Sequence, residues 1–248
     1  MSVYEKFARI YDRMGHDRFS IKMFAYSQKL LRQVRFKPKS VLDLACGTGS
    51  AALLWAAKRI TVYGVDGSAD MLSMARQKSR ELGRTVDFSH QPLTTFVLPQ
   101  TVDLVTCFFD SLNYLLTPEQ LAATFRSVHR ALNPGGYFIF DVNTPEAMRV
   151  LWDSQVYGDV RPDLAWIWTN YYFPKAKQAE VHATFFVRQG KLWQRFDELH
   201  AERGYSSGEI RAALKAADLK LVHMYECFHF TKPGRKSMRL AVVARKPK

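Results

Sequence analysis

The sequence predicts an α/β fold in which helices cover both faces of a mostly parallel sheet. Short apolar strand patterns alternate with helix patterns from residue 40 to about residue 142. The strands are almost continuously apolar, which is typical of parallel sheets that are buried on both faces. The chain has 248 residues, of which 47% are hydrophobic. That is enough for one domain of this kind with a modest insertion.

The elements can be assigned in order along the chain. Residues 1–12 read as an amphipathic helix, and residues 1–39 are expected to form N-terminal helices before the first strand. A later helix begins at Thr117, with Thr as its N-cap and Pro118 in its first turn, and stops at the Pro and Gly residues of Leu132–Gly136. Strands are expected over residues 40–44, 60–65, 85–89, 102–108 and 137–142, with further helices over 50–58 and 68–83.

The pattern changes after residue 160, which predicts an antiparallel β insertion over about residues 160–204. Its segments are rich in aromatic and β-branched residues, and Gln189-Gly190-Lys191 supplies a tight turn between the last two. A helix is then expected from Ser206 to about Ala217, followed by two strands that the turn at Lys232–Gly234 makes antiparallel. We therefore expect a single domain over 1–248, with insertion strands at 164–173, 180–188 and 192–203 and final strands at 219–228 and 237–245.

The net charge of +13 is concentrated at the two ends of the chain. Residues 1–39 hold ten Lys/Arg and three acids, and residues 228–248 hold seven Lys/Arg and no acid, so the middle is almost neutral. No DNA- or RNA-binding motif accompanies these ends. A solvated basic surface is therefore favoured, and an attraction for anionic partners such as nucleic acid or membranes is the alternative.

The three cysteines, Cys46, Cys107 and Cys227, lack metal-ligand spacing, and no metal site is expected. Their odd number, with two of them in or next to predicted strands, suits buried thiols in a reducing compartment. There is no apolar signal-peptide segment and no apolar run long enough to span a membrane. We therefore expect a cytoplasmic protein.

The segment Asp43-Leu-Ala-Cys-Gly-Thr-Gly49 joins a strand to a helix, as a nucleotide-binding loop does. Glycines let the backbone approach a ligand, and the helix N-terminus carries partial positive charge. A dinucleotide site needs a third glycine inside the helix, which is missing here. Asp43 would also suit the ammonium and sulfonium groups of S-adenosylmethionine (SAM) better than a pyrophosphate. The loop therefore favours SAM over NAD.

Asp66 ends the second predicted strand, 17 residues after Gly49. A carboxylate at this position can accept hydrogen bonds from both ribose hydroxyls, in NAD and SAM proteins alike. Asp43 or Asp66 alone could be a helix cap or a loop carboxylate. Together, at this spacing, they indicate an adenosine site.

These segments resemble the motifs of class I SAM-dependent methyltransferases of the small-molecule type. Val41–Gly49 is similar to their first motif, Val65–Leu72 to the second, and Leu132–Gly136 to the turn before the fifth strand. The resemblance covers nearly the whole chain. It is strongest to bacterial and archaeal members with an inserted antiparallel layer and with segments like Phe109–Leu115 and Glu198–Tyr205, some of which methylate sugar amines or glycine.

The resemblance implies a Rossmann-like seven-stranded sheet in the order 3-2-1-4-5-7-6, with strand 7 antiparallel. It also implies SAM as the cofactor and S-adenosyl-L-homocysteine as its product. The residues implied for the cofactor site are Asp43, Ala45, Gly47 and Gly49 in the loop, Asp66 and Gly67 near the ribose, Met71 against the adenine, and Tyr11 closing the pocket.

The adenine amino group has no obvious partner. Members of the family often place an acid after strand 3 for this contact, whereas this chain has Pro92 at the matching position. The contact would then fall to Gln91 or to the backbone N–H of Leu93.

Candidates for the acceptor site follow the strands, because ligands bind outside the carboxyl ends of parallel strands. Asp110 and Asn113 come directly after the strand at 102–108, where they either contact the ligands or build the loop. Methyl transfer is an in-line displacement that depends on alignment and on excluding water. A reacting amine must also be deprotonated, and His200, which shares a strand face with Glu198, is the candidate proton acceptor, with a packing role as its alternative.

The aromatic residues of the insertion are further candidates. Alternation puts Trp166, Trp168 and Tyr172 on one strand face. They are either ordinary core residues or, if the insertion covers the active site, an acceptor pocket with cation–π contact to an amine. Arg203 lies beyond them and is a candidate for acceptor binding.

The sequence thus predicts a methyltransferase that acts on a small molecule, with an amine nitrogen favoured as the methyl acceptor and an oxygen as the alternative. One alternative is a non-catalytic module with this fold, or a methyltransferase that binds RNA or DNA through its basic ends. Another, an NAD-dependent oxidoreductase, is disfavoured by Asp43. The sequence fits either a monomer or a homodimer.

Overall fold

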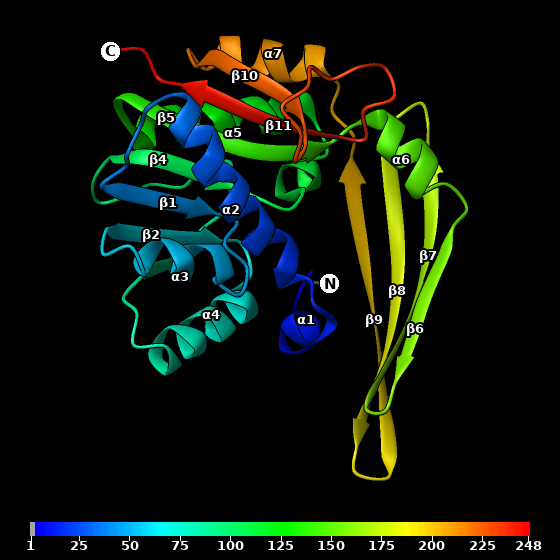
Figure 1. The fold of residues 1–248 in the computed structure, drawn as a ribbon. Helices are drawn as coiled ribbons and strands as arrows, with labels where there is room; N and C mark the ends of the chain where they lie inside the picture. The colour runs from blue at the N-terminus through cyan, green and yellow to red at the C-terminus, as the bar shows by residue number, and fades with distance from the viewer. Residues whose placement is uncertain (1–2) are drawn as a thin grey trace.

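A seven-stranded sheet forms the centre of the protein. The computed structural model describes residues 3–248 and is drawn in Figure 1. The strand order is β10-β11-β5-β4-β1-β2-β3, which is 3-2-1-4-5-7-6 when these strands are numbered along the chain. β11 pairs antiparallel with both β5 and β10, so the predicted sheet is confirmed. The strands are β1 Ser40–Leu44, β2 Thr61–Asp66, β3 Asp87–His90, β4 Val102–Cys107, β5 Leu132–Asn143, β10 Lys220–Glu226 and β11 Arg239–Arg245.

Helices cover both faces of this sheet (Figure 1). One face is buried by α2 and α3 through residues such as Leu30 and Trp55, and the other by α5 and α7 through residues such as Phe125 and Leu214. The predicted N-cap at Thr117 is part of a capping box with Gln120. The helices are α1 Ala8–Met14, α2 Asp17–Gln33, α3 Ser50–Ala56, α4 Ala69–Glu81, α5 Pro118–Ala131, α6 Pro145–Leu151 and α7 Ser207–Ala216, with a 3-10 helix η1 over Ser111–Tyr114.

The insertion is a separate antiparallel sheet of four strands in sequential order, β6 Val156–Arg161, β7 Leu164–Phe173, β8 Gln178–Gln189 and β9 Leu192–Arg203. Figure 1 shows it standing beside the main domain, with α1 near its inner face. That face packs Leu164, Val181 and Phe185 against Phe7 and Ile10 of the N-terminal segment. The predicted antiparallel layer is therefore confirmed.

Two elements of this region were not predicted. β6 is an edge strand in which five of the six residues are exposed, so it has no alternation of apolar and polar residues to reveal it. α6 has only seven residues, too few for a helical period to be recognised. The insertion accordingly begins at Val156 rather than at about residue 160.

The N-terminal segment differs in detail from the helix predicted over residues 1–12. Met1 and Ser2 lie outside the described residues, Val3 to Phe7 form turns, and α1 starts only at Ala8. Phe7 and Ile10 are buried, which anchors this segment between the two sheets. No helix in the described part of the chain is both long and apolar enough to cross a membrane.

Candidate active site

The loop between β1 and α3 contains two glycines with different surroundings. Gly47 and Gly49 both have positive φ, 54° and 79°. A Cβ atom on Gly47 would meet no atom within 4 Å, whereas one on Gly49 would lie 3.1 Å from Ala75 Cβ and 3.2 Å from Phe88 Cζ. Gly47 therefore faces open space, and Gly49 allows the loop to pack closely on α4 and β3.

That open space is a cavity of about 260 Å³, here called the first cavity. It lies at the carboxyl ends of β1 and β2 and is closed on one side by the N-terminal segment. The residues expected to bind SAM that line it are Tyr11, Ala45, Gly47, Asp66, Gly67, Met71 and Leu93. The cavity also contains residues that were not predicted, namely Val3, Tyr4, Asp17, Ser20, Cys46, Thr48, Ser50, Ser68, Phe108, Phe109, Ser111 and Tyr114.

Asp66 is held firmly at the edge of the first cavity. Its Oδ2 accepts a hydrogen bond from the Gly47 N–H at 2.7 Å, and its Oδ1 accepts one from the Ser68 N–H at 2.8 Å. Burial raises the pKa of Asp66, and the two backbone N–H groups oppose that rise. Each carboxylate oxygen has a further lone pair, so two ribose hydroxyls can still donate to it.

Three residues expected at the cofactor site lie outside the first cavity. Asp43 is buried beneath the loop, where its Oδ1 accepts a hydrogen bond from Thr106 Oγ1 at 2.8 Å. Gln91 holds its own loop together, since its amide donates to the Val97 carbonyl at 3.0 Å and accepts from the Val97 N–H at 2.9 Å. Gly49 packs against α4, as described above. All three support the loops that form the cavity.

A second cavity, of about 240 Å³, lies between the main domain and the insertion. It shares Tyr4, Tyr11, Phe109 and Tyr114 with the first cavity, so these four aromatic residues form the boundary between the two. Its other lining residues are Phe7, His16, Asp110, Trp152, Trp168, Val181, Ala183, His200, Glu202 and Arg239. Of the predicted acceptor residues, it therefore brings together Asp110, Trp168 and His200.

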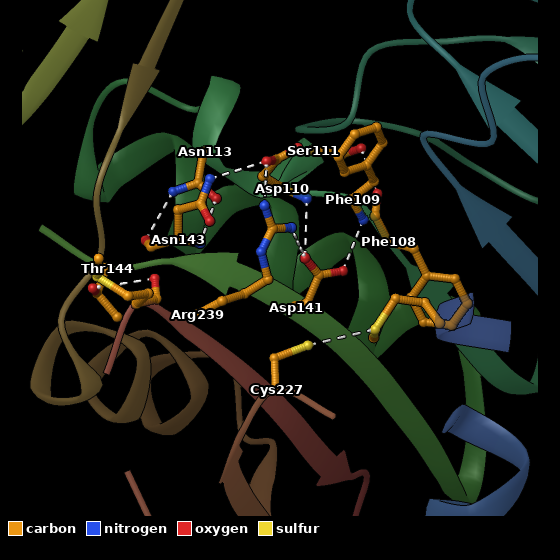
Figure 2. Close-up of polar contacts among 12 residues, drawn as sticks. Phe108, Phe109, Asp110, Ser111, Asn113, Asp141, Asn143, Thr144, Cys227 and Arg239 are labelled. Carbon is orange, nitrogen blue, oxygen red and sulfur yellow. Dashed lines mark hydrogen bonds and ion pairs between the residues drawn. The ribbon is translucent and has the colours of Figure 1, made fainter. Parts of the chain in front are cut away.

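Asp110 belongs to an ionic network with Asp141 and Arg239 (Figure 2). Arg239 donates from Nη2 to Asp110 at 2.7 Å and from Nη1 to Asp141 at 2.6 Å. Asp141 also accepts the N–H groups of Phe109 and Asp110, whose φ angles are 60° and 50°. The network thus fixes a backbone conformation that non-glycine residues rarely adopt. Arg239 was not predicted because it lies in the basic C-terminal segment, whose Lys and Arg residues were expected to be exposed to solvent.

Asn113 ties three segments together rather than lining a cavity. Its side-chain amide donates to the Asn143 carbonyl at 3.0 Å, and its oxygen accepts a hydrogen bond from the Asn143 N–H at 2.9 Å (Figure 2). The amide also donates to the Arg203 carbonyl at 2.7 Å. This joins η1 to the ends of β5 and β9. The side chain is fully buried, so the interactions are shielded from water.

The remaining predicted acceptor residues lie away from both cavities. Arg203 donates to Glu209 of α7 at 2.6 Å and stacks over the Tyr205 ring at 4.5 Å. Trp166 lines a separate surface hollow near Trp152, and Tyr172 is half-buried near Arg149. Alternation placed the aromatic residues on the correct strand face, but only Trp168 reaches the second cavity.

His200 takes part in a polar chain that crosses the boundary between the cavities. Its Nδ1 lies 3.0 Å from the Tyr114 hydroxyl, which lies 2.5 Å from the Tyr4 hydroxyl. On its other side, Nε2 lies 3.3 Å from Glu198 Oε2. Burial opposes ionisation of Glu198, but the nearby His200 ring and the hydrogen bonds from the N–H groups of Phe7 and Tyr4 lower its pKa.

Comparison with known proteins agrees with this geometry. Residues 41–136 match the methyltransferase domain family. A candidate methyltransferase of Geobacillus sp. (strain WCH70) is 32% identical over 246 residues, which cover 98% of this chain and 99% of that protein. The dTDP-3-amino-3,4,6-trideoxy-alpha-D-glucopyranose N,N-dimethyltransferase of Streptomyces venezuelae is 28% identical over 199 residues, covering 79% of this chain and 81% of that protein.

Among solved structures, the crystal structure of a SAM-dependent methyltransferase from Clostridium acetobutylicum ATCC 824 superimposes with a TM-score of 0.89 at 28% identity, covering 100% of both chains. The similarity therefore includes the inserted sheet as well as the parallel one. On the fold, the loop geometry and these similarities, the chain belongs to the class I SAM-dependent methyltransferases, with SAM as its cofactor.

Proposed function

We propose that this enzyme transfers the methyl group of SAM to an amine nitrogen of a small molecule bound in the second cavity. The two cavities meet at Tyr4, Tyr11, Phe109 and Tyr114. A cofactor in the first cavity can present its methyl group at this boundary, and an acceptor in the second cavity can approach it from the other side. That arrangement suits an in-line displacement.

The observation that carries the choice of an amine is the charge around the second cavity. Asp110 and Glu202 line it and Asp141 lies directly behind, whereas Arg239 is shared between two of these three carboxyl groups. An excess of carboxyl groups favours a positively charged acceptor over a neutral alcohol. Trp168 adds an aromatic wall of the kind that attracts cations. The similar Streptomyces venezuelae enzyme, by its name, also methylates an amino group.

The first cavity has features that suit SAM. The space over Gly47 and Gly67 is open, so the backbone can approach a ligand there. Asp66 would bind the ribose, Met71 and Leu93 would pack against the adenine, and Ala45 and Tyr11 would face the rest of the molecule. Asp43, Gly49 and Gln91 would support these loops. Bound SAM supplies a methyl group activated by its sulfonium.

The chain's own contribution is to align the amine, exclude water and remove a proton. The nitrogen lone pair forms the new N–C bond as the C–S bond breaks, which requires a neutral amine before attack. His200 is placed to take this proton, either directly or through the Tyr114 hydroxyl at 3.0 Å. Asp110 and Asn113 fix the loop that carries Tyr114. The N-terminal segment and the insertion shield the boundary from solvent.

We also propose that the enzyme acts in the cytoplasm. Cys46, Cys107 and Cys227 are all buried and unpaired. Free thiols of this kind are typical of reducing compartments.

The experiment is to incubate the enzyme with SAM and a mixture of small amines and alcohols, and to search by mass spectrometry for products heavier by one methyl group. We expect methylated amines. Methylation of alcohols alone would contradict the proposal.

The same assay tests His200. His200→Gln should reduce kcat by about 100-fold or more without weakening SAM binding, because it removes the proton acceptor. His182→Gln is the matched control, since His182 is exposed on β8. Equal rates for the two variants would remove His200 from the chemistry.

A further inference from the structure

Glu202 places a buried carboxyl group in the wall of the second cavity, and the mechanism above does not use it for chemistry. Its side chain lies on the inward face of β9, and the residue is only 3% exposed. Within the part of the chain that the structure describes, its Oε2 has no hydrogen-bond partner. A buried oxygen of this kind has lost its water without gaining a donor. A ligand in the cavity that donates a hydrogen bond to this oxygen would supply the missing partner.

The neighbouring strand leaves room for a ligand beside this carboxyl group. The residue opposite Glu202 on β8 is Ala179, and the next two inward-facing residues are Val181 and Ala183. Val181 and Ala183 both line the cavity. Small side chains at these positions keep the space in front of β9 open.

The only cation that lines the second cavity among the described residues, apart from histidines, is already paired. Arg239 donates to Asp110 and Asp141 at 2.7 and 2.6 Å, and its ion pairs are with these two acids rather than with Glu202. Burial raises the pKa of Glu202, and the charge of Asp110 adds to that rise. A cation bound in the cavity would oppose this rise, because a nearby opposite charge favours the carboxylate form.

We infer that Glu202 binds the protonated amino group of the methyl acceptor, which makes this residue the determinant of amine specificity. The inference deepens the proposed function, on which it rests, by naming the chemical class of the acceptor as an alkyl- or arylalkylammonium ion. Tyr4, Phe7 and Trp168 would surround the rest of the molecule. Because His200 lies on the same inward face of β9, the bound ammonium can then lose its proton to His200 before the nitrogen attacks.

The test measures binding separately from catalysis. The full-length enzyme is loaded with S-adenosylhomocysteine and titrated by calorimetry with primary amines from ethylamine to octylamine, with phenethylamine, and with the alcohols of the same skeletons. We expect at least one amine to bind ten-fold or more tightly than its alcohol. Glu202→Gln should abolish this preference and leave alcohol binding unchanged. Glu180→Gln, the same change on the outward face of β8, should retain it.

Two results would overturn the inference, namely no amine preference in the wild-type enzyme or a preference that survives in Glu202→Gln. If that variant fails to fold, as judged by loss of S-adenosylhomocysteine binding, difference infrared spectroscopy of the wild type decides. The carboxyl and carboxylate bands should change when the amine binds and not when its alcohol binds, and bands unchanged by the amine overturn the inference. Amine selectivity combined with methylation on oxygen would refute the proposed nitrogen chemistry and support the role of Glu202. Amine methylation with an unchanged KM in Glu202→Gln would support the proposed nitrogen chemistry and refute the role of Glu202.

Discussion

At the scale of single residues, the two glycines of the loop between β1 and α3 have different roles, although the sequence motif does not distinguish them. Gly47 and Gly49 stand two positions apart and both have positive φ. Gly47 borders the first cavity, whereas Gly49 borders the side chains of Ala75 and Phe88. Gly47 therefore leaves space for a ligand, and Gly49 allows the loop to pack closely against α4 and β3.

Alanine substitutions should separate these roles. Gly47→Ala should cost about 1 kcal/mol of stability, because alanine tolerates positive φ poorly, and should weaken S-adenosylhomocysteine binding by ten-fold or more, because its methyl group enters the cavity. Gly49→Ala should cost about 2–3 kcal/mol, since overpacking adds to the backbone strain. Chemical denaturation and calorimetry measure both effects.

Gly83→Ala is the control for the stability that is lost when alanine is placed at a positive φ. Gly83 has a φ of 59° and open space around it, away from both cavities. This variant should lose about the same stability as Gly47→Ala and retain full ligand affinity. If Gly47→Ala binds the ligand as well as Gly83→Ala does, Gly47 does not face the cofactor.

At the scale of elements, β9 organises the space between the two sheets. Its inward-facing Glu198 accepts the backbone N–H groups of Tyr4 at 2.9 Å, Lys6 at 3.2 Å and Phe7 at 3.1 Å. The insertion thereby holds the N-terminal segment over both cavities. Hydrogen bonds to a carboxylate are stronger than neutral ones, so this one side chain controls much of the segment's order.

Glu198→Ala should release the N-terminal segment. Amide exchange of Tyr4, Lys6 and Phe7, followed by NMR, should speed up by about ten-fold or more, and Glu180→Ala should leave it unchanged. In the wild type the interactions lower the pKa of Glu198 below its ordinary value of 4.5. The protection should therefore be complete above about pH 4.5 and be lost as the pH falls through the lowered folded-state pKa. Exchange that is equally slow in Glu198→Ala would show that apolar packing alone holds the segment.

The elements that the sequence predicts are those with a buried face. β1, β2, β4, β5, β7 and β8 have continuous or alternating apolar residues, and their existence and direction could be predicted. β6 could not, because it is an exposed edge strand. Among the residues that line the two cavities, Asp66 and Asp110 could be predicted from their positions at or shortly after the carboxyl ends of strands.

Residues that reach the site from distant segments could not be predicted in this way. Alternation placed His200 on one strand face with Glu198 and made it a candidate. It did not show that this face turns toward the parallel sheet, so Glu202 on the same face was missed. For the same reason, spacing located Asp43 near the loop without showing that its side chain points beneath it. Arg239 was considered only as one of the basic residues of the C-terminal segment.

At the scale of the whole molecule, the charge distribution looks different once the chain is folded. Arg239, one of the seven basic residues of the C-terminal segment, is withdrawn into the ionic network of the second cavity. Near the other terminus, Arg13 pairs with Asp163 of the insertion. Two residues of the terminal basic excess thus join segments that surround the site.

The buried acids link the stability of the whole molecule to pH, and Asp43 is the clearest case. Burial raises its pKa from 3.8 to about 7. Between these values the folded chain holds a proton that the unfolded chain releases, so the stability contributed by this group falls as the pH rises from about 4 to 7. Asparagine mimics the protonated acid and does not ionise. Asp43→Asn should therefore match the wild type near pH 4 and exceed its unfolding free energy at pH 8 by roughly 4 kcal/mol, at 1.36 kcal/mol per pKa unit.

Denaturant unfolding at both pH values measures this difference. Asp87→Asn, a change at an exposed acid, is the control. A variant less stable than the wild type at pH 8 would mean that the folded enzyme stabilises Asp43 as a carboxylate.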